Sequence, residues 1–145
     1  MKTVLLTSVF TIIGGVLIFV IGQVFLKFFI EPIHKLRAQI GRITDSLIYY
    51  ANVYFNPGMS KLDDAKEASS ELRKLGSELM AKRSVVPCYR FWSLLRVVPK
   101  LSDISRAHHS LIGLSNGLSP GDAHDNRKCV EEIKAALRLP KQLLR

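Results

Sequence analysis

Histidine and acidic side chains are the first candidates for chemistry in this chain, because they act as general bases and as metal ligands. The four histidines are His34, His108, His109 and His124. His108 and His109 are adjacent, so on a helix their side chains point about 100° apart and cannot share a metal ion as an i, i+4 pair does. Asp122, His124 and Asp125 match no known ligand spacing. The pattern favours a solvated loop, and we expect no metal.

Motifs for a nucleophile or a phosphate-binding loop are also missing from the sequence. The glycine-rich run from Gly113 to Gly121 lacks the Gly-Lys-Ser/Thr ending that cradles a phosphate. No G-x-S-x-G elbow exposes a serine, and no base is recognisable beside Cys88. Cys88 and Cys129 have no CxxC spacing, which indicates free thiols. The sequence therefore predicts a non-enzymatic protein that needs no cofactor.

The apolar N-terminus must position everything that follows it. From Thr3 to Leu26 no residue is charged. A stretch of about 24 residues gives roughly 36 Å of helix, enough to cross a hydrocarbon core of about 30 Å. A cleaved signal peptide is the alternative, but its apolar core is shorter and ends in small residues, which residues 23–30 do not offer. We expect a retained anchor over residues 1–30.

Charges beside the anchor predict its orientation. One side carries Lys2 and the α-amino group, and the other carries Lys27, Lys35, Arg37 and Arg42. By the positive-inside rule, residues 31–145 lie in the cytoplasm and the N-terminus lies outside. Of the 21 lysines and arginines only Lys2 and Lys27 precede residue 31, so 19 basic residues face 12 acidic ones beyond the anchor. This excess predicts attraction to anionic lipid headgroups, with nucleic acid as the less favoured partner.

Apolar residues beyond the anchor alternate at spacings of three and four, the heptad pattern of a helix that packs on another helix. In the soluble part this stripe comprises Leu36, Ile40, Ile43, Leu47, Tyr50 and Tyr54. Counting back by sevens leads to Gly22, Gly15 and Ser8, small residues that let membrane helices approach closely. We interpret the stripe as an association seam for a partner helix or a second copy. The alternative is that it faces its own domain.

Two helices of equal length are expected to form a hairpin over residues 31–83. The first runs to the turn signal Phe55-Asn56-Pro57-Gly58, and Pro32 can kink it where it leaves the membrane. Ser60 is a candidate N-cap for the second, which ends at Arg83. An antiparallel arrangement would return the chain to the bilayer surface.

Residues 85–99, which follow the hairpin, combine aromatic, apolar and basic side chains. Tyrosine and tryptophan beside arginine are typical of interfacial segments, because amphipathic rings favour the headgroup layer. The residues expected at the membrane interface are Tyr89, Arg90, Phe91, Trp92 and Arg96. The alternative is that Phe91 and Trp92 close the core of a small domain. Such a composition could also stack bases, but its apolar density favours lipid over nucleic acid.

Two more helices are expected over residues 102–139. The first begins at Ser102 and ends at Asn116-Gly117, and a polar loop over residues 119–126 leads to the second. Residues 140–145 form a basic tail. The predicted architecture is all-α: one transmembrane helix over residues 1–30 and one cytoplasmic helical domain over residues 31–139.

Several short runs of the sequence are distinctive. They are Tyr50-Ala51-Asn52-Val53-Tyr54, Asn56-Pro57-Gly58, Glu67-Ala68-Ser69 with Leu72-Arg73, and Leu111-Ile112-Gly113-Leu114-Ser115-Asn116. With these runs the chain resembles a group of small single-pass bacterial membrane proteins of uncharacterised function, over most of residues 22–118. The resemblance implies a location in the bacterial inner membrane. It implies no activity and no site residues.

Together these observations predict a membrane-anchored helical adaptor or accessory subunit that binds a protein partner, or a second copy, at the cytoplasmic face of the membrane. One alternative is a membrane-perturbing effector that oligomerises through Ser8, Gly15 and Gly22. A second alternative is a membrane-tethered, metal-dependent hydrolase that uses His108, His124 or Asp125.

Overall fold

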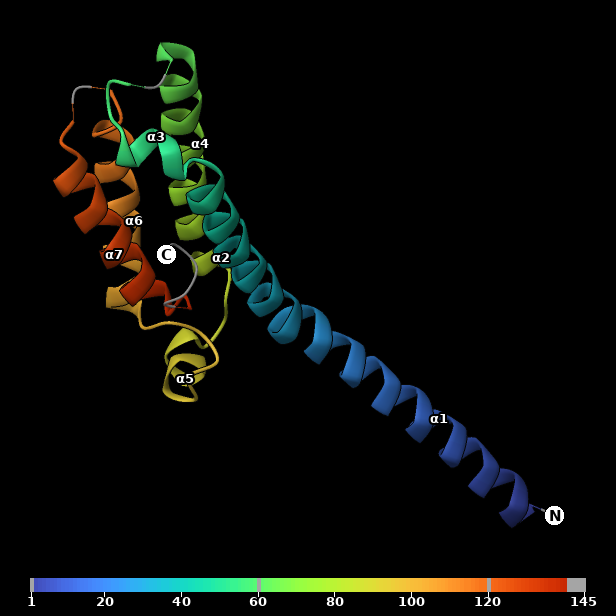
Figure 1. The fold of residues 1–145 in the computed structure, drawn as a ribbon. Coiled ribbons are helices and arrows are strands. Elements are labelled where there is room, and N and C mark those ends of the chain that lie inside the picture. The colour runs from blue at the N-terminus through green and yellow to red at the C-terminus, as the bar shows by residue number, and fades with distance from the viewer. Residues whose placement is uncertain (1, 60, 120, 141–145) are drawn as a thin grey trace.

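The computed structural model describes residues 2–59, 61–119 and 121–140, and every regular element among them is helical (Figure 1). In chain order the elements are α1 (Lys2–Phe25), η1 (Leu26–Ile30), α2 (Glu31–Tyr49), α3 (Ala51–Phe55), α4 (Leu62–Ser84), α5 (Tyr89–Leu94), α6 (Leu101–Asn116) and α7 (Ala123–Leu137). The prediction of an all-α protein is confirmed for this part of the chain.

A single continuous helix carries the chain out of the apolar N-terminus and into the domain. α1 projects away from the other helices, and its described side chains are almost all exposed (Figure 1). Among the described residues this is the one helix that is long and apolar enough to cross a membrane. Exposed Phe, Ile, Val and Leu at this density are costly in water, which makes α1 a candidate membrane span.

The helix passes Pro32 without breaking. Proline has no N–H to donate to the carbonyl four residues earlier, and its ring crowds that carbonyl. The five residues of η1, just before Pro32, form a wider π-helical turn, in which Glu31 N–H donates to Leu26 O. A π-turn of this kind moves the crowded carbonyl aside, so the anchor continues directly into α2.

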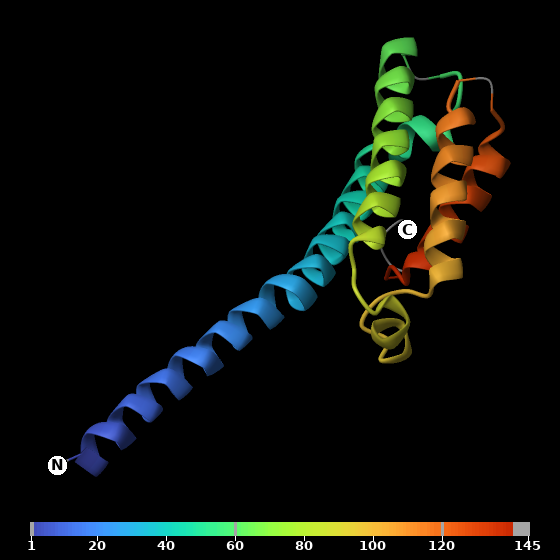
Figure 2. The ribbon, with the colours of Figure 1, turned by 180° about the vertical axis from the view of Figure 1, so that it is seen from behind.

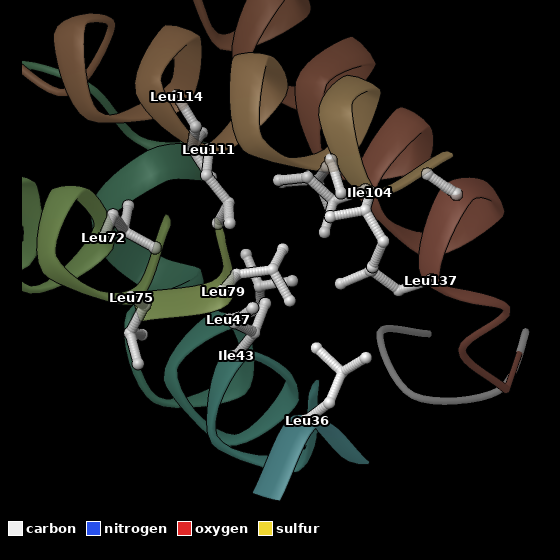
Figure 3. Packing of buried hydrophobic residues seen from close by; sticks show 14 of the residues in the cluster. Leu36, Ile43, Leu47, Leu72, Leu75, Leu79, Ile104, Leu111, Leu114 and Leu137 are labelled. Atoms are coloured by element: carbon white, nitrogen blue, oxygen red, sulfur yellow. The ribbon is translucent and has the colours of Figure 1, made fainter. Parts of the chain in front are cut away.

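Four helices make the core of the domain. α2 packs on α4, α4 on α6 and α6 on α7, while α3 contacts α7 and closes the bundle (Figure 2). Large side chains from all four helices meet in one interior (Figure 3): Leu36, Ile43 and Leu47 from α2, Leu72, Leu75 and Leu79 from α4, Ile104, Leu111 and Leu114 from α6, and Leu137 from α7. α4 runs back towards the end of the domain from which α1 leaves (Figure 2).

Helix boundaries differ from the expected ones at three places. The first soluble helix is interrupted at Tyr50, so its last turn becomes the separate helix α3. The helix expected from Asn126 begins three residues earlier, because the Asp122 carboxylate accepts a hydrogen bond from His124 N–H at 3.0 Å and caps α7. α4 begins at Leu62, and the cap predicted at Ser60 lies outside the described residues.

Candidate functional site

The predicted association stripe lies inside the chain's own core. Leu36, Ile43, Leu47 and Tyr54 are at most 1% exposed, and Ile40 and Tyr50 are partly buried against the same core. The helices that cover the stripe are α4, α6 and α7 of the same chain (Figure 3). A heptad stripe requires a helical neighbour, and here the domain supplies it. The stripe of α2 is therefore not available to an outside helix.

The small residues of α1 that continue the stripe lie on the candidate membrane span. A Cβ built on Gly15 or Gly22 would meet nothing within 4 Å, and Ser8 is exposed. They lie on α1, which projects away from the other helices (Figure 1).

The candidate chemical residues are dispersed over α6 and α7. Among the described residues, no three His, Cys, Asp or Glu side chains gather closely enough to hold a metal ion. Asp122 acts as the cap of α7, and His124 and Asp125 are exposed in the first turn of that helix. His108 packs over Gly76 of α4, and His109 is exposed beside it. Burial raises the pKa of the Cys129 thiol, with Glu132 and Asp125 acting in the same direction.

One side of the segment expected at the membrane interface closes the core. Val86 and Val98 are buried, and Tyr89 and Trp92 pack partly against the same cluster. Tyr89 Oη donates to Pro99 O at 2.8 Å, which joins the start of α5 to the chain that follows it. Burial raises the pKa of Tyr89 to about 12, although the Arg83 guanidinium, 5.9 Å from the ring centroid, acts against the rise.

The other side of the segment is exposed and apolar. Phe91 is 54% exposed, Leu94 80% and Leu95 53%; we call these three residues the α5 tip. α5 lies at the end of the domain from which α1 leaves (Figure 1, Figure 2). The alternative that Phe91 and Trp92 close the core holds for Trp92 and not for Phe91, and the interfacial interpretation stays a prediction.

Basic residues surround the α5 tip. Two adjacent hollows, of about 260 and 430 Å³, share Arg96 and Arg138 as walls. Arg37 of α2 also lines the first hollow, and Arg90 and Lys100 line the second. We call the two hollows together the basic groove. None of the described residues that line it is acidic.

A third hollow, of about 460 Å³, lies where α2 leaves the anchor. Phe28, Pro32 and Val85 give it apolar walls, and Lys27, Lys35 and Lys82 stand at its edge. Two of these lysines have partners. Lys35 Nζ lies 2.7 Å from Glu31 Oε1, and Lys82 Nζ donates a hydrogen bond to Gln39 Oε1 and forms an ion pair with Glu78 Oε2. The cations of this hollow are thus largely neutralised within the chain, unlike those of the basic groove.

Of the residues of the α5 tip and the basic groove, the sequence predicted only Arg90, Phe91 and Arg96 at the interface. Leu94 and Leu95 carry a local signal, since they share an apolar helical face with Phe91, although they were not among the residues expected there. Arg37, Lys100 and Arg138 carry none, because they join Arg96 only through the packing of α2 and α7. Comparison of the chain with protein-family models, with curated proteins and with solved structures found no match.

Proposed function

We propose that this protein is a non-enzymatic, membrane-anchored helical adaptor or accessory subunit whose domain is held against the cytoplasmic face of the inner membrane at two points. α1 is the first point of attachment and the α5 tip is the second. The observation that carries the proposal is the exposed trio Phe91, Leu94 and Leu95 at the end of the domain next to the anchor.

The energetics favour a second attachment. Complete burial of a Leu or Phe side chain contributes about 1.5–3 kcal/mol relative to exposure. Each basic residue near an anionic bilayer surface adds about 1 kcal/mol. α1 already holds the domain at the surface, so insertion of the α5 tip is an intramolecular step at high effective concentration. A few exposed side chains are therefore sufficient to attach the α5 tip to the bilayer surface.

Two attachments fix an orientation, which an adaptor needs in order to present one face to its partner. The stripe of α2 is occupied, so the partner's contact falls on the outer faces of the domain or on the open side of α1. The positive residues that follow α1 support a cytoplasmic domain, and the resemblance to small bacterial membrane proteins supports the inner membrane.

Trp92 is the sole tryptophan of the chain and lies within α5, so its fluorescence tests the second attachment directly. The full-length protein would be reconstituted in phosphatidylcholine vesicles whose acyl chains carry bromine at different depths. We expect strongest quenching by bromines near the headgroups, since the α5 tip inserts only shallowly.

Variants give this experiment its control. Exchange of all three residues of the α5 tip for serine should abolish most of the quenching. The matched control exchanges Ile48 and Leu62, exposed apolar residues elsewhere in the domain, for serine and should leave quenching unchanged. An unquenched Trp92 in the native chain, or equal quenching in both variants, would contradict the second attachment.

The adaptor function is tested by crosslinking in cells at native expression, followed by native mass spectrometry of the purified complex. A stoichiometric second protein supports an adaptor. A homo-oligomer without any partner supports the second candidate, a self-assembling membrane effector, which the open surface around Gly15 and Gly22 favours. That candidate requires toxicity on overexpression and its relief by Gly15→Leu.

A further inference from the structure

The basic groove contains charge that the described part of the chain does not balance. Ion pairs elsewhere satisfy Arg42, which lies 2.7 Å from Glu78, and Arg106, which lies 2.5 Å from Asp103. Within the described residues no hydrogen bond or ion pair holds the side chains of the groove: Arg37, Arg90, Arg96, Lys100 and Arg138. Asp103, the acid nearest to Lys100 in sequence, is taken by Arg106. All five side chains are exposed, so their charges are free to bind an anion from outside the described structure.

Two helix ends build the groove in the same way. Arg96 follows α5 and Arg138 follows α7, and both have left-handed backbones with φ of 58° and 56°. After each arginine the chain closes a six-residue turn: Val97 N–H donates to Trp92 O at 3.0 Å, and Leu139 N–H donates to Lys134 O at 2.9 Å. This is the Schellman motif, in which glycine usually occupies the left-handed position.

Arginine at both left-handed positions points to a use for the side chain, since glycine would satisfy the backbone with less strain. The hydrophobic residues that end the two motifs, Val97 and Leu139, line the same hollow. The motifs thus place two guanidinium groups over a shared apolar floor. The carboxyl ends of α5 and α7 bring about half a negative charge each, too little to neutralise five cations.

The groove combines an apolar floor with a cationic rim. Ile40, Val97 and Leu139 line the floor of the first hollow, and Leu94 of the α5 tip lines the second. A small soluble anion would leave this floor exposed to water. An anionic phospholipid matches both parts, because arginine binds phosphate oxygens in a bidentate manner and the glycerol and acyl carbons can cover apolar side chains.

We propose that the basic groove binds the phosphate of an anionic phospholipid headgroup, with Arg96 and Arg138 as the central ligands and Arg37, Arg90 and Lys100 around them. This proposal rests on the proposed function, because the α5 tip brings the groove to the headgroup layer. It assigns the predicted attraction to anionic headgroups to one groove and adds three residues that the α5 segment alone does not contain.

The test compares lipid binding with folding. The full-length protein in detergent is offered an equimolar mixture of phosphatidylglycerol and phosphatidylcholine, and bound lipid is read by native mass spectrometry. We expect a preference for phosphatidylglycerol of roughly tenfold, because both headgroups carry the phosphate but the choline cation of phosphatidylcholine is repelled by the five basic side chains. The double variant Arg96→Gly with Arg138→Gly should lose this preference and keep or raise its thermal midpoint, because glycine suits both backbones.

Two further variants complete the design. Arg37→Gln with Arg90→Gln changes only helical or surface positions and should weaken the preference without altering the backbone. Lys61→Gln with Lys66→Gln removes the same charge from exposed sites near the start of α4 and should leave the preference intact. A preference that survives in the glycine variant, or that falls equally in the Lys61/Lys66 control, would overturn the proposal.

The same assay distinguishes a phospholipid from two other kinds of ligand. Stabilisation of the protein by inorganic phosphate without any lipid preference would overturn the lipid assignment in favour of a soluble phosphate. Preferential retention of an added oligonucleotide would overturn it in favour of nucleic acid. Quenching of Trp92 in neutral vesicles does not depend on the groove, so a failure of this proposal is distinguishable from a failure of the proposed membrane attachment.

Discussion

The amide of Asn126 joins three parts of the fold that are distant in sequence. Its Nδ2 donates to Tyr54 O at 3.1 Å and to Gly117 O at 3.0 Å, so it connects α7 with the end of α3 and with the residue after α6. The side chain is 1% exposed. Water cannot replace these bonds, which makes this polar residue part of the core.

Asn126→Ala should lower the free energy of unfolding by about 2–3 kcal/mol, because the buried Tyr54 carbonyl and the partly buried Gly117 carbonyl lose their donor. Chemical denaturation of the full-length protein in detergent checks this value. Asn52→Ala is the matched control, since Asn52 is exposed and its carbonyl, not its side chain, accepts the bond from Asn56. A loss below about 0.5 kcal/mol, the range of ordinary surface changes, would contradict the role of Asn126.

A buried tyrosine, Tyr54, and a partly buried one, Tyr89, predict an alkaline limit to stability. Burial raises the pKa of Tyr54 to about 12, with Glu131 acting in the same direction, and burial raises the pKa of Tyr89 to about 12. Tyr54 Oη also donates to Leu47 O at 2.7 Å. A raised pKa in the folded state means that folding favours the protonated phenol, whose contribution is complete below the unfolded pKa of about 10.

We therefore expect the thermal midpoint to be independent of these groups below pH 10 and to fall as the pH rises from about 10 to about 12. Thermal melts monitored by circular dichroism across this interval measure the effect. Tyr54→Phe and Tyr89→Phe should each flatten the alkaline slope while lowering stability at neutral pH through a lost hydrogen bond. An unchanged slope in both variants would show that other groups cause it.

At the scale of elements, α2 illustrates the limits of a heptad stripe as evidence. A helix buries its apolar face against any complementary helix, and the periodicity is the same whether that neighbour belongs to the same chain or to another. Here α4, α6 and α7 cover the stripe. We therefore expect substitutions in the stripe of α2 to destabilise the domain itself, and to affect a complex only through this loss of stability.

Leu47 and Ile48 allow this to be tested with adjacent residues of one helix. Leu47 is 1% exposed and Ile48 is 44% exposed. Leu47→Ala should cost about 2–5 kcal/mol of stability through lost burial and the cavity left behind. Ile48→Ala should cost less than about 1 kcal/mol. Equal effects in equilibrium unfolding would contradict the placement of Leu47 in the core.

α5 shows how one short element can serve two surroundings. Val86 and Val98 on either side of it are buried, whereas Leu94 between them is among the most exposed apolar residues of the domain. The six-residue helix α5 exposes on one face the apolar side chains that do not pack in the core. This division closes the core and leaves one apolar face free for the proposed contact with the membrane surface.

At the scale of the whole molecule, the charges on either side of α1 predict the topology. Fusions of alkaline phosphatase and of green fluorescent protein to the C-terminus measure it, since the first is active only outside the cytoplasm and the second fluoresces only inside. We expect the green fluorescent protein fusion to fluoresce and the alkaline phosphatase fusion to be inactive. An active phosphatase fusion with a dark fluorescent fusion would reverse the orientation and place the basic groove on the opposite face of the membrane.

The sequence by itself determined the local features of this protein. An uncharged apolar run is enough to define a candidate membrane span, because the number of residues gives the helix length and this length is compared directly with the thickness of the hydrocarbon core. The all-helical class and the approximate position of each helix followed from apolar periodicity, Pro57-Gly58 and similar stop signals. The sequence did not predict the break at Tyr50 or the early start of α7 after its cap Asp122. Both features depend on the contacts and capping hydrogen bonds of a single helical turn.

Only the tertiary structure decided which surfaces are covered and which are free. It placed Leu36, Ile43 and Leu47 against the chain's own helices and left Phe91, Leu94 and Leu95 exposed. It also brought Arg37, Arg96 and Arg138 around one hollow, although each lies on a different segment. Periodicity shows which side of a helix is apolar, but the neighbour of that side depends on how all the helices pack together, and that packing brings residues far apart in sequence into one site.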